Sequence, residues 1–257
     1  MKLGFLGTGT ISSAMVTGLH ATGTAEYEVI VSPRNATVAE HLKRSFPQVS
    51  VASNNQEVVD QSSIVVIAVR PQVVDRVLAE LRFRDDHNVI SLVSGLSVKR
   101  LAALVSPATT ISRAVPLPST ARRRCPTPIY PGDTESAKIF GLLGKAIVVE
   151  TEGQFDALCT ATATMAAYFG YAEGIASWLT DHGIPPCQAQ NYITSIFAGL
   201  SATAMESPEK SFRAMSAEHA TPGGTNEQVM AYLSQHGVFD RLSEALDGVM
   251  KRVTSAR

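Results

Sequence analysis

A short apolar run near the start of the chain breaks into glycines and then resumes at helical spacing. Residues 3–6 are Leu-Gly-Phe-Leu, and Gly7-Thr8-Gly9 follow them before Thr10. This order predicts a β-strand, a tight turn and the N-terminus of an α-helix. Gly7 permits the turn, and Gly9 lets backbone N–H groups approach a pyrophosphate that faces the positive end of the helix dipole. We therefore predict a dinucleotide-binding loop; an ordinary glycine turn between a core strand and a core helix is the alternative.

The fingerprint of such a loop has a third glycine, and this chain has Ser12 in its place. A small hydroxyl side chain still permits close packing of the helix on the strand. We expect the cofactor to be contacted here by Gly7, Thr8, Gly9, Thr10 and Ile11.

A second strand-like run, residues 27–32, comes about 20 residues after the glycine loop, where dinucleotide folds select their cofactor. NAD-binding folds usually have an acidic residue there for the ribose 2′-hydroxyl, whereas this chain has Ser32, Arg34 and Asn35. Hydroxyl, guanidinium and amide donors favour a 2′-phosphate, so we predict NADPH rather than NADH. The same residues are also ordinary turn chemistry before a helix that begins near Asn35.

Length and charge restrict the class of protein. At 257 residues, 45% hydrophobic and 18% charged, the chain is long enough for one large or two modest domains. Its 22 basic and 23 acidic residues give a formal net charge of −1, which predicts no binding to nucleic acid or to an anionic membrane. We also expect no signal peptide and no membrane span, because glycines interrupt the apolar opening within a few residues.

Cysteines and histidines give no sign of a metal site. Cys125, Cys159 and Cys187 are far apart and lack a Cys-x-x-Cys spacing, so neither a disulfide framework nor a zinc site is supported. The six histidines form no recognisable ligand pair. We predict no metal and a reducing, cytoplasmic location.

Residues 1–152 alternate short β-branched runs with helical stretches, which is typical of a doubly wound parallel sheet. The predicted strands lie in residues 3–6, 27–32, 49–51, 64–69, 89–93, 109–113, 127–130 and 146–149. The fold class we predict is α/β: an N-terminal Rossmann dinucleotide-binding domain over residues 1–152, followed by a C-terminal all-helical domain over residues 153–257.

The second half of the chain is helical. Apolar or small residues recur three and four positions apart from Phe155 to Leu179, which predicts one long helix. Residues 182–186 end that helix and start a second, a third opens after Gly224, and a fourth covers about residues 239–253. The first helix has more apolar surface than a domain of this size covers easily, so we predict packing against a second copy of the chain; a core within one chain is the alternative.

Open parallel sheets bind ligands beyond the carboxyl ends of their strands. Three segments follow predicted strands at that edge, namely residues 68–71, 94–97 and 113–118. Ordinary strand-ending turns are the alternative for each. The residues we expect to contact the cofactor from these segments are Ala68, Val69, Arg70, Pro71, Ser94, Arg113 and Ala114.

A further glycine turn precedes the third predicted helix, at residues 221–228. Thr225 and Gln228 have the spacing of a capping box, and Gly223 and Gly224 free the preceding backbone. A helix N-terminus with exposed N–H groups suits a small carboxylate, so this turn is a candidate seat for the acid group of a substrate. A capped helix after a loop is the alternative.

With these segments in order, the chain resembles the pyrroline-5-carboxylate reductase family, whose members reduce a cyclic imine to proline with NAD(P)H. The likeness covers nearly the whole chain. It rests on residues 4–9, on residues 68–71 (Ala-Val-Arg-Pro, where the family has A-V-K-P), on residues 113–116 (Arg-Ala-Val-Pro, for R-A-M-P) and on residues 221–225 (Thr-Pro-Gly-Gly-Thr, for S-P-G-G-T).

The resemblance implies a Rossmann domain followed by helices that interlock in a homodimer or a higher homo-oligomer. It implies an active site between the glycine loop and the Pro-Gly-Gly turn, whose N–H groups hold the carboxylate of an imine. Asn226 would donate a hydrogen bond to the substrate, and Thr225, Tyr168 and His219 are candidate proton relays. The substrate-binding residues carried over are Thr221, Gly223, Gly224, Thr225 and Tyr168, and the catalytic ones are Thr225 and Asn226.

Three departures from the family fall around the expected substrate. Residues 113–119 lose the amide that the family has beside the nicotinamide, residues 163–168 read Ala-Thr-Met-Ala-Ala-Tyr instead of the family's G-S-x-P-A-Y, and Asn226 replaces a threonine. We therefore expect reduction of 1-pyrroline-5-carboxylate to proline or of a close analogue, with another imine as an alternative.

Two other functions compete with this one. A β-hydroxyacid dehydrogenase shares the two-domain plan but uses a lysine early in its helical domain, and this chain has no lysine between Lys145 and Lys210. A dinucleotide-binding protein that has lost catalysis, acting as a sensor or a structural dimer, remains open. Turnover of NADPH with cyclic imines distinguishes it from the reductase.

Overall fold

The computed structural model describes residues 1–21 and 27–255. It divides into two compact units, one made of Met1–Thr160 with Met250–Arg257 and the other of Ala161–Val249. The boundary thus differs from the one expected at residue 152, because the helix that starts at Glu152 buries Phe155 and Asp156 in the first unit.

An eight-stranded sheet in the order β3-β2-β1-β4-β5-β6-β7-β8 forms the first unit. The strands are β1 (Lys2–Leu6), β2 (Glu28–Val31), β3 (Val49–Val51), β4 (Ile64–Ile67), β5 (Asn88–Ser91), β6 (Thr110–Ala114), β7 (Cys125–Tyr130) and β8 (Gly144–Val148). The first six strands in this order, from β3 to β6, are parallel to one another. Strand β7 runs antiparallel to β6, and β8 is parallel to β7. The predicted strands and the α/β fold class are confirmed.

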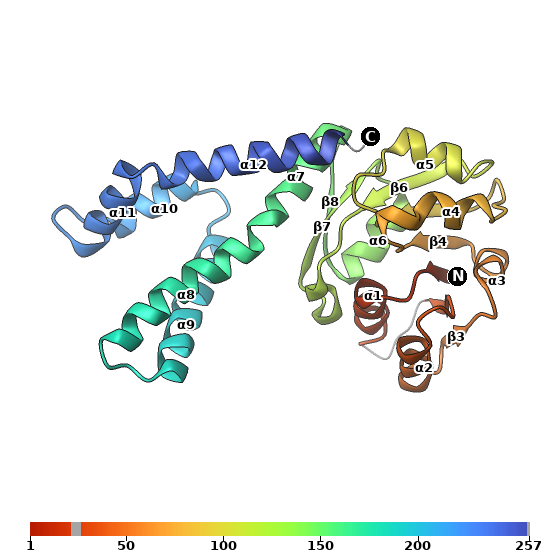
Figure 1. Cartoon of the computed structure of the whole chain (residues 1–257), viewed down its shortest axis with the longest axis horizontal. Coiled ribbons are helices and arrows are strands. Elements are labelled where there is room, and N and C mark those ends of the chain that lie inside the picture. The colour runs from red at the N-terminus through yellow and green to blue at the C-terminus, as the bar shows by residue number, and fades with distance from the viewer. Residues whose placement is uncertain (22–26, 256–257) are drawn as a thin grey trace. The chain divides into compact units, whose positions relative to one another are not determined.

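Helices cover both faces of this sheet, as Figure 1 shows. The helices α1 (Thr10–His20), α2 (Ala36–Ser45) and α6 (Thr134–Leu142) share one hydrophobic cluster with Leu3 and Phe5 of β1. The opposite cluster joins α3 (Asn55–Gln61), α4 (Val74–Ala79) and α5 (Val98–Leu104) to Leu6. Successive strand residues point to opposite faces, so a strand buried on both sides must be apolar throughout. All four residues of β4 are buried for this reason.

The predicted long helix from Phe155 to Leu179 is wrong as a single element. The chain forms α7 (Glu152–Ala161), a 3₁₀ turn at Thr162–Thr164 and α8 (Met165–Asp181). In the turn, the Thr164 hydroxyl donates to the carbonyl of Ala161 at 2.8 Å. Threonine side chains compete for backbone hydrogen bonds in this way, and β-branched residues are weaker helix formers than the apolar pattern alone suggests.

The second unit contains α8, α9 (Pro186–Glu206), α10 (Phe212–His219), α11 (Thr225–Gln235) and most of α12 (Val238–Ser255). Helices α9, α11 and α12 were predicted, and α10 was not. Within residues 161–249 only Ala189 and Ile193 are buried, while Phe212 is 81% exposed and Trp178 58% exposed. One copy of this unit therefore has almost no core of its own. Among the described residues, no helix combines the length and the hydropathy needed to cross a bilayer.

His87 is a fully buried histidine at the amino end of β5. Its Nδ1 accepts the N–H of Arg84 at 3.0 Å. Burial lowers the pKa of His87, and the Arg84 cation lowers it further, against the opposing effects of Asp86 and of two backbone carbonyls. The folded chain therefore favours the neutral imidazole, whereas the unfolded chain takes up a proton at about pH 6.5.

We expect His87 to make the protein less stable on acidification. Because the folded-state pKa is the lower one, its contribution is complete above about pH 6.5 and is lost as the pH falls toward that folded pKa. Urea unfolding of wild type and His87→Gln between pH 7 and 5 measures it, since glutamine keeps an acceptor but does not titrate there. The variant should show the shallower fall in unfolding free energy; parallel pH profiles would contradict the assignment.

Candidate active site

The glycine loop joins β1 to α1 at the carboxyl edge of the sheet. Gly7 has φ +103°, and a Cβ at this position would lie 2.5 Å from the carbonyl oxygen of Ala68. Gly9 is the N-cap of α1, and a Cβ there would meet nothing within 4 Å. Gly7 is therefore fixed by backbone conformation and packing, while Gly9 leaves open space before a helix N-terminus. That arrangement fits the pyrophosphate of a dinucleotide.

Two serines hold this loop in place. The Ser12 hydroxyl donates to the carbonyl of Gly7 at 2.6 Å, and Ser12 is almost fully buried. Ser32 Oγ accepts the N–H of Gly7 at 2.9 Å, and the Thr8 hydroxyl donates to the Ser32 carbonyl at 2.6 Å. Ser32 is only 1% exposed, so the prediction that its hydroxyl contacts a 2′-phosphate is corrected. Ser32 instead fastens the glycine loop to the end of β2.

Arg34 and Asn35 remain at the position expected for a 2′-phosphate. Both are exposed, and they lie between β2 and α2. Asn35 is the N-cap of α2, and its side-chain oxygen accepts the N–H of Val38 at 3.5 Å. The side-chain amide of Asn35 and the guanidinium of Arg34 are therefore candidate donors after β2.

The segments after β4 and β5 also reach the carboxyl edge. Ala68 packs against Gly7 through its carbonyl, and Arg70 and Pro71 are exposed where a short 3₁₀ turn begins. After β5, Ser94 is exposed and Gly95 has φ +75°. In the sheet β4 lies beside β1 and β5 lies beside β4, so both segments follow strands at the same carboxyl edge as the glycine loop, where open parallel sheets bind their ligands.

Arg113, at the end of β6, belongs to a buried charge cluster. Its Nη1 donates to Glu152 Oε1 at 2.7 Å and to Asp156 Oδ1 at 3.3 Å, and its guanidinium lies 4.4 Å from the ring centre of Phe155. Arg113 is 3% exposed and Asp156 is fully buried. The side chain of Arg113 is turned to α7, so a cofactor contact at this residue stays a prediction that only its backbone could meet.

The same cluster reaches the loop after β5. Glu152 Oε1 also accepts the N–H of Val98, the first residue of α5, at 2.8 Å. One carboxylate thus joins the start of α7, the end of β6 and the segment that contains Ser94. Burial raises the pKa of the nearby Cys159 thiol to about 11, against a partial lowering by Arg113, so this thiol stays protonated near neutral pH and is a poor nucleophile.

The Pro-Gly-Gly turn of the second unit precedes α11. The predicted capping box of Thr225 and Gln228 is wrong, because the helix begins at Thr225 and its N-cap is Gly224, which has no side chain. Glu227 takes the capping role instead, accepting the N–H of Gly223 with Oε2 at 2.7 Å. Gly223 has φ +70°, which favours glycine.

The candidate catalytic side chains of this unit have structural partners. Asn226 Nδ2 donates to the carbonyl of His219 at 3.1 Å and so links the end of α10 to the start of α11. His219 Nδ1 lies 2.8 Å from the carbonyl of Met215. Tyr168 is 47% exposed on α8, and its ring packs 5.7 Å from that of Phe197. The predicted donation from the Asn226 amide to a substrate therefore competes with its bond to His219.

Two family models match the chain. Residues 2–95 match the family described as NADP oxidoreductase coenzyme F420-dependent, and residues 152–255 match pyrroline-5-carboxylate reductase dimerisation. The first match contains the glycine loop and the second contains the Pro-Gly-Gly turn.

Curated and solved relatives cover the full length. A pyrroline-5-carboxylate reductase of Synechocystis sp. is 29% identical over 98% of this chain and 97% of its own. The crystal structure of 1-pyrroline-5-carboxylate reductase from Streptococcus pyogenes has a TM-score of 0.86 at 24% identity, covering 99% of this chain and 98% of that one. Plasmodium falciparum pyrroline carboxylate reductase with NADP bound has a TM-score of 0.83 at 18% identity, covering 100% of this chain and 98% of that one. Both structures share the fold of this chain.

Proposed function

Because the chain belongs to the pyrroline-5-carboxylate reductase family, we propose that it reduces the C=N bond of 1-pyrroline-5-carboxylate with NADPH and so forms proline. The glycine loop is the observation that supports this proposal most directly. Gly9 leaves space for a pyrophosphate at the N-terminus of α1, and Gly7 packs closely against the backbone of Ala68. The chain is an NAD(P)H-dependent oxidoreductase acting on C=N.

When bound, NADPH would supply the hydride that the imine carbon accepts, and the protonated imine nitrogen would become the amine. A protonated imine is already electrophilic, so the main task of the protein is to hold that carbon about 3–3.5 Å from the nicotinamide. The backbone at Ala68, Ser94 and Ala114 would shape the nicotinamide side. The N–H groups of Gly223, Gly224 and Thr225 are the predicted carboxylate donors, but those of Gly223 and Gly224 bond to Glu227 and to the carbonyl of Thr221. Thr225 and Asn226 would therefore offer their N–H groups to the substrate carboxylate, with Tyr168 beside the ring. Ala68, Ala114 and Thr225 lie in segments that match the family motifs, whereas Ser94 and Asn226 are proposed from their places after β5 and at the start of α11.

Turnover tests the proposal directly. The purified protein should oxidise NADPH when 1-pyrroline-5-carboxylate is added and should accumulate proline in equal amount. No oxidation with this or any other cyclic imine would instead support the alternative, a dinucleotide-binding protein that has lost catalysis. Oxidation only with other cyclic imines would identify a reductase of different specificity.

We expect Arg34→Ala to weaken NADPH binding by about 1.5–3 kcal/mol, the usual worth of a hydrogen bond to a charged group. NADH lacks the 2′-phosphate, so its affinity should stay the same. Arg44→Ala is the matched control, because it removes the same charge from the last turn of α2. Equal NADPH affinities of wild type and Arg34→Ala, measured by fluorescence titration, would show that Arg34 does not bind the 2′-phosphate.

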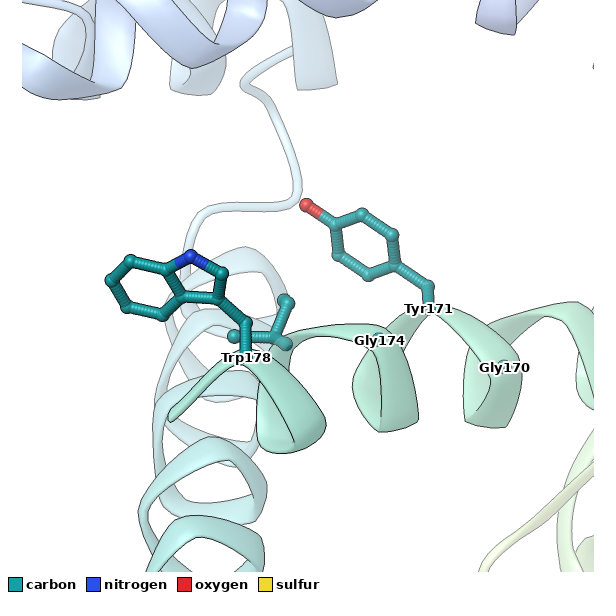
Figure 2. A pocket seen from close by; sticks show the side chains of 5 residues that line it. Gly170, Tyr171, Gly174 and Trp178 are labelled. Carbon is teal, nitrogen blue, oxygen red and sulfur yellow. The ribbon is translucent and has the colours of Figure 1, made fainter. Parts of the chain in front are cut away.

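We also propose a homodimer that forms through α8. Gly170 and Gly174 lie on one face of this helix beside Tyr171 and Trp178, whose side chains project on the same side (Figure 2). They line an apolar groove of about 430 Å³, and a Cβ on either glycine would meet nothing within 4 Å. The small residues allow a helix of a second chain to approach closely, which would cover the aromatic surface.

Gly174→Leu should therefore weaken the dimer by at least about tenfold, or about 1.4 kcal/mol. Gly141→Leu is the control, since Gly141 lies on α6 of the first unit and a Cβ there also meets nothing within 4 Å. Sedimentation equilibrium over micromolar concentrations gives the dimer dissociation constants, and a monomeric wild type would refute the dimer.

A cytoplasmic location is proposed as well, because all three cysteines are free.

A further inference from the structure

Glu227 places a carboxylate in the turn proposed to hold the carboxylate of the substrate. It is the third residue of α11, and its Oε2 accepts the N–H of Gly223 at 2.7 Å. A carboxylate oxygen on a backbone N–H at a helix N-terminus is the interaction that a substrate acid group would make there. The chain therefore supplies its own acid group to this turn.

The bond to Glu227 leaves fewer donors for a ligand. The N–H of Gly223 is engaged by Glu227, and the N–H of Gly224 donates to the carbonyl of Thr221 at 2.8 Å. The first intrahelical bond of α11 runs from the N–H of Gln228 to Gly224 at 3.1 Å. The N–H groups of Thr225 and Asn226 precede it, as the first N–H groups of a helix do. A substrate carboxylate bound to these two groups would lie close to the Glu227 carboxylate and be repelled by it.

We propose that Glu227 is a specificity-determining residue that weakens binding of carboxylated imines relative to cyclic imines without an acid group. The inference rests on the proposed function for the reaction, and on the Glu227–Gly223 bond for the specificity. Binding a carboxylate here requires either displacement of the Glu227 side chain or proximity of two like charges, whereas an imine without an acid group requires neither.

Two substitutions separate the effect of the Glu227 charge from the effect of its hydrogen bond to the N–H of Gly223. Glu227→Gln keeps an acceptor for the N–H of Gly223 but removes the charge, and Glu227→Ala removes both. Glu227 is exposed, so both variants should fold. Glu244→Gln, which removes one charge from the exposed surface of α12, is the matched control.

The first measurement is steady-state turnover of NADPH with 1-pyrroline-5-carboxylate and with 1-pyrroline, which lacks the carboxylate. We expect Glu227→Ala to lower KM for 1-pyrroline-5-carboxylate by about tenfold and to leave KM for 1-pyrroline and both kcat values within about twofold. Glu227→Gln should lower the same KM if repulsion dominates, and Glu244→Gln should change neither. Unchanged KM for the carboxylated imine in Glu227→Ala would overturn the proposal.

The second measurement does not depend on turnover. Calorimetric titration of the NADPH-loaded protein with cyclopentanecarboxylate should give a dissociation constant about tenfold lower for Glu227→Ala than for wild type. Tighter binding without turnover of any imine would support the role of Glu227 and refute the proposed reaction. Turnover without any change in carboxylate binding or KM would refute the role of Glu227 and leave the reaction standing.

Discussion

Replacing Arg113 with methionine should lower the free energy of unfolding by about 3–5 kcal/mol. The substitution keeps most of the side-chain volume but removes the cation that contacts Glu152 and Asp156. Asp156 is fully buried, so its carboxylate would lose this cation without gaining access to water. Removing one partner of a buried ion pair costs much more than removing a pair that water already solvates. Urea unfolding at neutral pH measures the difference.

The exposed pair of Arg100 and Asp75 provides the control. Its side chains are 47% and 54% exposed, so Arg100→Met should cost at most about 1 kcal/mol. Equal losses for the two variants would show that the Arg113 cluster contributes no more than a surface ion pair. A loss confined to Arg113→Met would show that the cluster stabilises the junction of β6, α5 and α7, which flanks the proposed nicotinamide site.

The sheet could be predicted because its signal is local. Residues 64–67 are apolar without interruption, and such a run has few alternatives to a strand covered on both faces. The glycine loop was predictable for a similar reason, since Gly7 and Gly9 have distinct backbone requirements that the sequence states directly. The predicted single helix over residues 155–179 failed because apolar spacing continues through Thr162–Thr164, where the backbone forms a 3₁₀ turn between α7 and α8.

The side-chain partners of the site could not be read from the sequence. Glu152 and Asp156 are four residues apart on one helix face, but nothing in the sequence pairs them with Arg113 about 40 residues earlier. Ser32 has a hydroxyl that could bind a phosphate, but its Oγ points to the glycine loop, where it accepts the N–H of Gly7. Glu227 was overlooked because the predicted N-cap, Thr225, is one residue too late. With Gly224 as the N-cap, Glu227 is the third residue of the helix, and its carboxylate accepts a backbone N–H from the preceding turn.

Replacing Gly9 with valine should weaken NADPH binding by about 100-fold or more, or about 2.7 kcal/mol, while the protein stays folded. The two glycines of the loop allow these effects to be separated. A Cβ at Gly9 meets nothing within 4 Å, so valine fits the folded chain and fills only the space proposed for the pyrophosphate. At Gly7, a side chain would combine a backbone at φ +103° with a contact of 2.5 Å to the Ala68 carbonyl.

Gly7→Val should therefore lower stability and binding together, whereas Gly9→Val should lower mainly binding, with an unfolding free energy within about 1.5 kcal/mol of wild type because valine is a poorer N-cap than glycine. Fluorescence titration with NADPH and urea unfolding of the same samples give both quantities. If Gly9→Val binds NADPH as tightly as wild type, the pyrophosphate does not lie on the N-terminus of α1, and the position of the nicotinamide inferred from the strand ends loses its support. If it binds weakly but is also unfolded, the space before α1 is needed for folding rather than for the cofactor.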